Sequence, residues 1–202
     1  MNRSLIMFMN IKNKIIKIDN INNYKKMDIQ NIVLDLDETL ISSIEPEIFQ
    51  KYKDTLIHKE HFVFENSYYI FPRPGVQEFL DFVFQNYNVT VWTAASLEYA
   101  LFIIENIITN KPNRKLDYVF FNNHCGISQE KYNNAKQLKQ LWEVFKLDQF
   151  NENNTVIVDD RTDLKLNQEN NVVNCIPYFV YDESTDDGLN QVRDIILKKN
   201  KL

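Results

Sequence analysis

"IVLDLDETLI", residues 32–41, begins as an apolar run and then places Asp35, Asp37 and Glu38 close together. The apolar residues predict a buried strand that ends at this acidic turn. Carboxylates repel one another and lose hydration at the edge of a core, so packing gains nothing from the cluster. Residues two apart on a strand point to the same side, so Asp35 and Asp37 can face one small volume. A magnesium ion and a phosphoryl group would both fit two carboxylates placed in this way.

The composition is typical of a globular protein with one domain. The chain has 202 residues, of which 44% are hydrophobic and 25% charged, so it can bury a sizeable core. Its net charge of -5 argues against direct nucleic-acid binding, which uses clustered Lys and Arg. The two cysteines, Cys125 and Cys175, are too few for a disulfide framework or a zinc cluster, and they favour a reducing compartment.

The first residues, "MNRSLIMFMNIKNK", contain an apolar run that is too short to span a bilayer. No small-residue cleavage pattern follows this run. We therefore expect no membrane segment and an intracellular protein, either nuclear or cytoplasmic. We also expect a monomer.

The glycines exclude two common kinds of phosphate-binding loop. Only Gly75, Gly126 and Gly188 occur, and they lie far apart in the sequence. The dinucleotide-binding loop and the Walker loop each need several glycines within a few residues. Any phosphate that this protein binds must therefore be held by other groups.

The order of motifs divides the chain into a lead-in and one domain. Residues 1–27 are Asn-rich and carry six Lys or Arg against one Asp, whereas 28–202 read as a single domain. An insert at 42–71 contains "HFVFENSYYIF", two aromatic runs around Glu65-Asn66-Ser67 that predict a hairpin. "FPRPG" then breaks the chain, and Gly75 opens a helix.

Strands and helices alternate through the remaining sequence. Four further strands are predicted by the runs "NVTVWTAAS", "LDYVFF", "NTVIVDDR" and "NVVNCI". Helices are predicted from Ser96 through about Ile108, over 134–147 and over 187–198. This alternation predicts an α/β fold with a mostly parallel sheet flanked by helices. Ligands of such folds lie beyond the carboxyl ends of the strands.

Polar side chains gather at those predicted strand ends. They are Asp35 and Asp37 after the first strand, Thr93 after the second, Lys136 at a helix start, and Asp159 with Asp160 after "NTVIV". Each has an ordinary explanation by itself, as a helix cap, a residue bonded to nearby backbone or a solvated lysine. Because one edge of one sheet collects all of them, we interpret them as a single site.

Phosphoryl transfer gives each of these residue types a role. Carboxylate oxygens bind Mg²⁺, and a carboxylate can act as nucleophile to form an aspartyl-phosphate. A second carboxyl can protonate the leaving oxygen and later activate water. Thr93 and Lys136 would hold the phosphoryl oxygens while charge shifts.

"DLDETL", "VWTAAS", a Lys at a helix start and "VIVDD", in this order, resemble the haloacid-dehalogenase-type phosphatases. "RPG" before a helix and the hairpin insert resemble more narrowly the RNA polymerase II C-terminal-domain phosphatase group, which includes the small C-terminal-domain phosphatases and the NLI-interacting-factor-like proteins. The resemblance covers roughly residues 30–198. It implies a Rossmann-like haloacid-dehalogenase fold with a small β insert between the first motif and the RPG helix.

The resemblance also implies a role for each candidate residue. Asp35 resembles the nucleophile and Asp37 the general acid and base, with its backbone carbonyl also facing Mg²⁺. Thr93 and Lys136 resemble the phosphate-binding residues of the second and third motifs. The implied metal-side acids are Asp35, Asp37, Asp159 and Asp160. For the lysine, Lys131 and Lys139 remain alternatives to Lys136.

The function implied is a Mg²⁺-dependent protein phosphatase that hydrolyses phosphoserine or phosphothreonine through an aspartyl-phosphate. The expected partner is a phosphorylated protein segment, such as the C-terminal repeat of RNA polymerase II, because the small insert leaves the site open to a peptide. Arg161-Thr162 stands where the small phosphatases tend to have Ser-Pro, so the substrate preference can differ.

Other functions remain as alternatives. A phosphatase of this type can act on phosphotyrosine or a small metabolite, and a non-catalytic phosphoprotein-binding module could keep the fold. His124-Cys125 also resembles the start of the cysteine-based phosphatase loop, but its sixth position after the cysteine is Lys131 rather than Arg. A receiver domain uses the same residue types in a different order, which excludes it.

Overall fold

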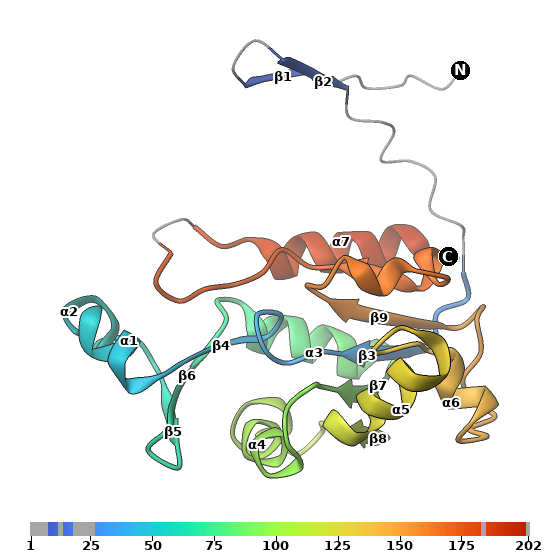
Figure 1. Ribbon diagram of the computed structural model, residues 1–202, viewed down its shortest axis with the longest axis horizontal. Helices are drawn as coiled ribbons and strands as arrows, with labels where there is room; N and C mark the ends of the chain where they lie inside the picture. The colour runs from blue at the N-terminus through green and yellow to red at the C-terminus, as the bar shows by residue number, and fades with distance from the viewer. Residues whose placement is uncertain (1–7, 12–13, 18–26, 183–184, 201–202) are drawn as a thin grey trace.

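The computed structural model of the chain describes residues 8–11, 14–17, 27–182 and 185–200. Its centre is a five-stranded parallel sheet with the strand order β10-β9-β3-β7-β8 (Figure 1). The strands are β3 (Asn31–Leu34), β7 (Asn88–Trp92), β8 (Tyr118–Phe120), β9 (Thr155–Asp159) and β10 (Val172–Asn174). The acidic stretch therefore forms the middle strand, and the predicted α/β fold with a parallel sheet is confirmed.

Alternate residues of the middle strand face different helices. Ile32 and Leu34 pack into the larger core, which also contains residues of α3 (Val76–Asn86), α4 (Leu97–Ile103) and α7 (Gly188–Lys199). Val33 packs into a second core with residues of α5 (Asn122–Tyr132) and α6 (Lys139–Glu143). Helices thus cover both faces of the sheet, which requires apolar residues on both sides of each strand.

The helices predicted around the second strand are confirmed. Gly75 precedes α3 and has a left-handed φ of 74°, a conformation that glycine adopts without a steric cost. Ser96 caps α4 by accepting a hydrogen bond from the backbone N–H of Tyr99 at 3.3 Å. The helix then continues as a π-helical segment, η1 (Ile104–Ile108).

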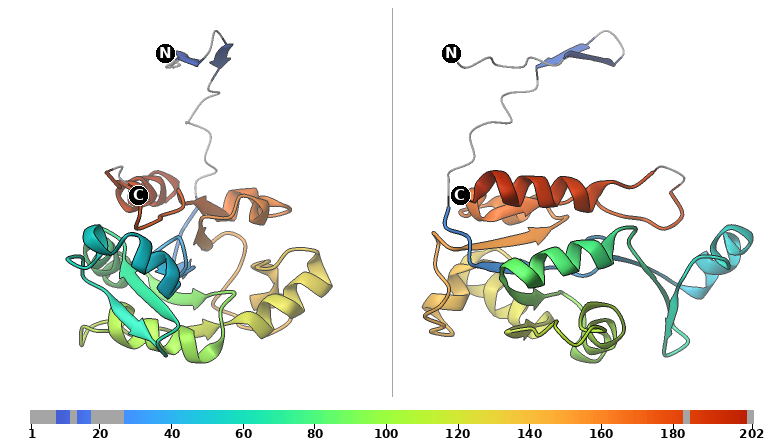
Figure 2. Two further views of the ribbon diagram at one scale, coloured as in Figure 1. Left: turned by 60° about the vertical axis from the view of Figure 1, so that its left-hand side comes forward. Right: turned by 180° about the vertical axis from the view of Figure 1, so that it is seen from behind.

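The insert forms a small antiparallel sheet with the order β4-β6-β5 beside one end of the main sheet (Figure 2). Its elements are β4 (Ile41–Ile44), α1 (Pro46–Lys51), α2 (Lys53–Leu56), β5 (Phe62–Phe64) and β6 (Tyr68–Pro72). The predicted hairpin is confirmed, since β5 pairs with β6 and the Ser67 amide donates to the Phe64 carbonyl at 2.9 Å.

The helix predicted over 134–147 is wrong. The chain instead forms α5, which the sequence analysis missed, and then the short α6, while 133–138 are not helical. Side chains bind the backbone amides of this segment: Asn134, within it, accepts from the Lys136 amide, while Ser128 and Gln168, outside it, accept from those of Gln137 and Leu138. These bonds hold the segment as a turn, so Lys136 precedes the helix rather than opening it.

Arg73 of the "RPG" motif links the acidic turn to the segment just before α7. Its buried guanidinium donates to both carboxylate oxygens of Asp186, at 2.7 and 2.6 Å, and to the backbone carbonyl of Thr39 at 2.9 Å. A Cβ at Gly188 would lie 2.0 Å from the Arg73 Nη2 atom. The first residue of α7 is therefore a glycine because the guanidinium occupies the space of a side chain.

The predicted lead-in, 1–27, lies mostly outside the described residues. Within them, β1 (Phe8–Ile11) and β2 (Lys14–Lys17) pair antiparallel. Met27 is buried, and its backbone amide donates to the Lys199 carbonyl at 2.9 Å. Among the described helices, none has the length and apolarity needed to cross a bilayer.

Candidate active site

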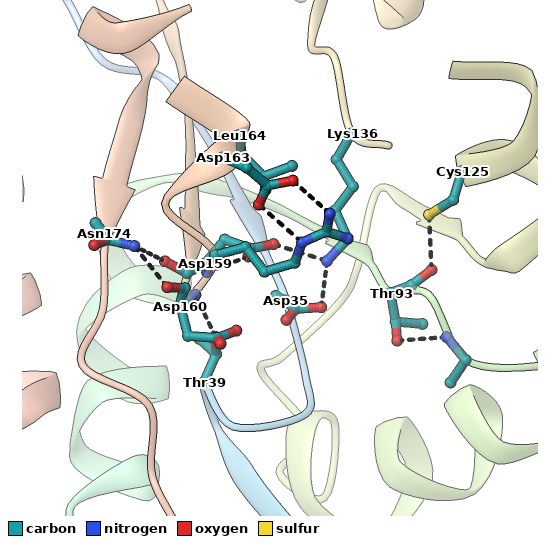
Figure 3. A network of polar contacts seen from close by, with 12 residues as sticks. Asp35, Thr39, Thr93, Cys125, Lys136, Asp159, Asp160, Asp163, Leu164 and Asn174 are labelled. Atoms are coloured by element: carbon teal, nitrogen blue, oxygen red, sulfur yellow. Dashed lines mark hydrogen bonds and ion pairs between the residues drawn. The ribbon is translucent and has the colours of Figure 1, made fainter. Parts of the chain in front are cut away.

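The ends of three neighbouring strands bring the predicted residues together. Asp35 follows the middle strand, and Asp159 ends β9 on one side of it. Thr93 follows β7 on the other side. Figure 3 shows the result, with Asp35 lying between Asp159 and Thr93. Parallel pairing in register produces this arrangement, because the carboxyl ends of adjacent strands then lie at one edge.

Lys136 joins the two strand-end aspartates. Its ammonium donates to Asp35 Oδ1 at 2.5 Å and to Asp159 Oδ2 at 2.7 Å, and all three side chains are buried (Figure 3). Of the alternative lysines, Lys131 is exposed with its ammonium over the Tyr132 ring, and Lys139 is half-buried at the start of α6. The turn that replaces the predicted helix thus places the Lys136 ammonium between Asp35 and Asp159.

Asp35, Asp159 and Asp160 form an acidic cluster within the described part of the chain. One carboxylate oxygen from each lies within 4.8 Å of the others. When all three are ionised, the single Lys136 ammonium leaves this cluster with an excess of negative charge. Carboxylate oxygens so placed are ligands that a hard divalent cation such as Mg²⁺ prefers. The donor set therefore fits the expected metal.

Several backbone and side-chain groups fix the acidic pair at the end of β9. Thr39 Oγ1 accepts a hydrogen bond from the Asp160 amide at 3.1 Å, and Asn174 donates to the carbonyls of Asp159 and Asp160 at 3.0 and 2.9 Å. The Arg161 amide donates to Asp159 Oδ1 at 2.9 Å. Neither Thr39 nor Asn174 was among the residues predicted for the site. Thr39 lies within "IVLDLDETLI", two residues after Asp37, so its position beside the acids could have indicated a role in the site.

Asp37 is not one of the three acids whose carboxylate oxygens lie within 4.8 Å of one another. Its Oδ1 accepts a hydrogen bond of 2.6 Å from the hydroxyl of Tyr99, a buried residue of α4. The side chains of Asp35 and Asp37 therefore have different hydrogen-bond partners, Lys136 and Tyr99, although both residues follow the same strand. Tyr99 was not among the predicted site residues, although the predicted cap at Ser96 places it in the first turn of a helix beside the strand ends.

Burial raises the pKa of both aspartates after the middle strand. It raises the pKa of Asp35 to about 8, with the Lys136 ammonium opposing the shift. Burial also raises the pKa of Asp37, while the hydrogen bond from Tyr99 opposes it. Burial alone would lower the pKa of Lys136, but the carboxylates of Asp35 and Asp159 raise it, so the ammonium keeps its charge.

Thr93 presents its hydroxyl from the end of β7. Its Oγ1 accepts a hydrogen bond from the Ala95 amide at 3.0 Å, which leaves the hydroxyl hydrogen for another acceptor. Its backbone carbonyl accepts a bond of 3.4 Å from the Cys125 thiol (Figure 3). Thr93 is thereby held rigidly next to Asp35.

Cys125 has the wrong surroundings for a nucleophile. It lies within α5, not in a loop after a strand, and it is buried. Burial raises the pKa of its thiol, whereas a nucleophilic cysteine needs a lowered pKa. The geometry therefore disfavours the cysteine-based alternative.

An open cavity of about 420 Å³ begins at Asp37. Its lining comprises Asp37, Glu38, Ser43, Phe64, Tyr68, Ala95, Ser96 and Tyr99. Two aromatic residues of the insert thus reach the space beside the candidate general acid. A larger cavity, of about 570 Å³ around residues 72–78, contains none of the candidate acids.

Comparison with known proteins identifies close relatives by sequence. A family model described as NLI interacting factor-like phosphatase matches residues 30–200. The CTD phosphatase-like protein 355R of invertebrate iridescent virus 6 is 41% identical over 179 residues, which cover 83% of this chain and 97% of the viral protein. The protein of the same name from invertebrate iridescent virus 3 is 37% identical over 174 residues, covering 80% and 88%.

Solved structures resemble the chain in fold. The fission yeast RNA polymerase II CTD phosphatase Fcp1, bound to beryllium fluoride, matches with a TM-score of 0.56 and 21% identity over 84% of this chain. A second Fcp1 structure matches with a TM-score of 0.54 and 20% identity over 85%. The chain spans about half the length of these Fcp1 chains, 50% and 49%. An HAD-like family hydrolase from Porphyromonas gingivalis matches with a TM-score of 0.50 and 12% identity, over 84% of this chain and 98% of that one.

Proposed function

Because the chain belongs to the NLI interacting factor-like phosphatase family, we propose that it is a Mg²⁺-dependent phosphatase of phosphoserine or phosphothreonine in a protein segment. The family and the haloacid-dehalogenase fold support a phosphoric monoester hydrolase. The observation that carries the proposal is the contact of the Lys136 ammonium with Asp35 and Asp159 at 2.5 and 2.7 Å, beside Asp160.

In the proposed first step, an Asp35 carboxylate oxygen attacks the phosphorus atom. The bond between phosphorus and the substrate oxygen breaks, and that oxygen keeps the electron pair and takes a proton from Asp37. In the second step, Asp37 removes a proton from water as the water oxygen attacks the phosphorus of the aspartyl-phosphate. Inorganic phosphate leaves and the Asp35 carboxylate is regenerated.

Asp35, Asp159 and Asp160 would hold Mg²⁺, together with the backbone carbonyl of Asp37. The bound ion supplies electrostatic stabilisation of the phosphoryl oxygens and offsets the repulsion between phosphate and the acidic cluster. Lys136 is already placed against Asp35, so its ammonium can reach a phosphoryl oxygen next to the attacking carboxylate. Thr93, at the end of the neighbouring β7, can also donate its hydroxyl hydrogen to a phosphoryl oxygen.

The open cavity supports a protein substrate. A phosphoseryl side chain has to reach Asp35 while the rest of its peptide stays outside, and an open groove beside Asp37 permits this. The relatives named CTD phosphatase-like and the Fcp1 likeness support the C-terminal repeat of RNA polymerase II, or a similar phosphopeptide, as the class of substrate. A small metabolite or a phosphotyrosine peptide is the competing substrate.

A substrate panel tests this function. The purified chain should hydrolyse phosphoserine and phosphothreonine peptides faster than phosphotyrosine peptides or sugar phosphates. The activity should disappear in EDTA and return with excess Mg²⁺, because the acidic cluster repels phosphate without the cation. Phosphate release measured across the panel decides the matter. Faster turnover of a metabolite than of every phosphopeptide would overturn the protein-substrate assignment, and full activity in EDTA would overturn the metal requirement.

The insert is expected to select the peptide. Tyr68 lines the cavity with its side chain partly exposed, and the Phe64 ring lies beside it. Tyr68→Ala should raise KM for a phosphopeptide by about tenfold, the order expected from losing an aromatic contact, with a smaller loss in kcat because the Tyr68 ring also contacts Tyr99. Hydrolysis of p-nitrophenyl phosphate, which is too small to span the groove, should stay the same.

Val63→Ala provides the matched control. Val63 lies on the neighbouring strand of the same hairpin with an exposed side chain, and it is not among the residues that line the cavity. Its replacement should leave both substrates unaffected. If Tyr68→Ala lowered activity on the peptide and on p-nitrophenyl phosphate equally, the insert would be a structural element only.

A further inference from the structure

The hydrogen bond from the Tyr99 hydroxyl to Asp37 Oδ1 is 2.6 Å long, and it joins residues 62 positions apart in the sequence. A phenol is protonated at neutral pH, so the Tyr99 hydroxyl donates and Asp37 Oδ1 accepts. When the Asp37 carboxyl carries a proton, that proton must then lie on Oδ2. The contact thus gives the two oxygens of this carboxyl group different roles: Oδ1 accepts from Tyr99, and Oδ2 carries the proton.

We propose that Tyr99 is a positioning residue for proton transfer: its hydroxyl holds Asp37 Oδ1, so that Oδ2 delivers the proton to the leaving oxygen. This inference rests on the proposed function, because it concerns the acid of that reaction. The Tyr99 hydroxyl donates to Asp37 rather than to Asp35, so it acts through Asp37.

The structure holds the Tyr99 ring in place from three directions. Tyr99 stands in the first turn of α4, where Ser96 accepts a hydrogen bond from its backbone amide at 3.3 Å. The Phe64 ring meets it edge to face at 5.4 Å and 89°, and the Tyr68 ring at 5.9 Å and 76°. A helix and the insert therefore fix the hydroxyl together, which is what a positioning role requires.

The chemistry of the leaving group gives a readout that packing alone would not produce. When the phosphorus–oxygen bond breaks, a seryl or phenyl oxygen leaves poorly unless it takes the proton from Asp37. A p-nitrophenyl oxygen leaves well as the anion, so it depends little on that proton. Loss of the Tyr99 hydroxyl should therefore slow poor leaving groups far more than good ones.

The experiment measures kcat/KM for aryl phosphates of similar size, from p-nitrophenyl to phenyl phosphate, with a phosphoserine peptide alongside. This constant covers the steps up to the first irreversible bond cleavage, so slow hydrolysis of the phosphoenzyme does not mask the effect. Tyr99→Phe should lower kcat/KM by about ten- to a hundredfold for phenyl phosphate and the peptide, and by less than about threefold for p-nitrophenyl phosphate. The dependence of rate on leaving group should approach that of Asp37→Asn.

Tyr118→Phe is the matched control. It removes a hydroxyl that accepts a hydrogen bond from Gln149 Nε2 at 2.8 Å. Tyr118 is the first residue of β8, so it lies at the amino ends of the strands, whereas the acids lie at the carboxyl ends. Its leaving-group dependence should equal that of the unaltered protein. The thermal midpoints of the two variants should agree within a few degrees, since each keeps its ring.

A second comparison separates positioning from substrate contact. In an Asp37→Asn background, the added Tyr99→Phe change should cost little, because the group that Tyr99 holds no longer carries a proton. Equal losses on all the aryl phosphates, or the same loss in both backgrounds, would overturn the inference and leave the proposed function intact. If the unaltered protein showed no phosphatase activity, or if Asp35→Asn did not abolish that activity, the proposed function would be overturned, and the inference with it.

Discussion

Asp35→Asn should lower turnover by about four orders of magnitude or more on every substrate, because the change removes the attacking carboxylate. Asparagine keeps the size and shape of the side chain, and its amide oxygen can still accept a hydrogen bond from Lys136. The variant should therefore fold, and its thermal midpoint should stay near that of the unaltered protein. Steady-state phosphate release with circular dichroism melting measures both quantities.

A trapping experiment identifies the residue that carries the phosphoryl group. After a short incubation with labelled substrate and acid quenching, label should be covalently attached to a peptide that contains Asp35. The Asp35→Asn variant should carry none. Attachment of the label elsewhere would reject Asp35 as the nucleophile even if the variant were inactive.

Cys125→Ser is the natural comparison for this result. Cys125 is the candidate for a cysteine-based mechanism, and its thiol is buried against the backbone carbonyl of Thr93. Serine can keep that hydrogen bond, so turnover should be nearly unchanged. Loss of activity in Cys125→Ser together with retained activity in Asp35→Asn would contradict the aspartate-based mechanism altogether.

The strand ends could be predicted from the sequence because their evidence is local. An apolar run marks each strand, and the next polar residues necessarily occupy its carboxyl end. Asp35, Thr93 and Asp159 are thereby predicted at one edge, and in the structure they lie at the ends of three adjacent strands. This prediction needed no knowledge of which side chains touch.

The segment before α6 could not be predicted in this way. α5 buries only Cys125 and Ser128, so it lacks the repeating apolar face that marks a helix in sequence. The turn that follows depends on Gln168, which lies 30 positions from its partner Leu138. Side-chain bonds over such distances override local helix propensity, and no short window of sequence records them.

The contacts of Asp37 could not be predicted from the sequence for a related reason. The spacing of Asp35 and Asp37 correctly indicates two carboxyls near one turn, but it assigns them one common direction. The strand ends at Leu34, so the alternation of a strand does not apply to the turn after it. Glu38 adopts a left-handed φ of 55°, and Asp37 meets Tyr99 instead of the acidic cluster.

Lys136→Met should lower kcat by about a hundred- to a thousandfold, the range for removing one group that stabilises developing charge. Methionine keeps most of the volume of the side chain but lacks its charge. The two buried carboxylates that share the ammonium would then face each other and the incoming phosphate without it. Repulsion between Asp35 and the phosphoryl group should rise in the transition state, where their oxygens approach.

Lys131→Met and Lys139→Met are the matched controls. They remove the same charge from positions nearby in the sequence, one exposed and one half-buried, while leaving Lys136 between Asp35 and Asp159. Their kcat should remain close to that of the unaltered protein. A large loss in either control together with a tolerated Lys136→Met would show that the phosphate-binding lysine is not Lys136.

Lys136→Arg tests whether positive charge alone is sufficient. The ammonium is a compact donor that reaches two carboxylates from one point, whereas a guanidinium is a planar fork with a wider head. Lys136 is 1% exposed, so the surroundings leave no room for the larger group without displacing Asp35 or Asp159. We expect kcat of Lys136→Arg to fall nearly as far as that of Lys136→Met. Full activity in Lys136→Arg would mean that the charge matters and that the bridging geometry does not.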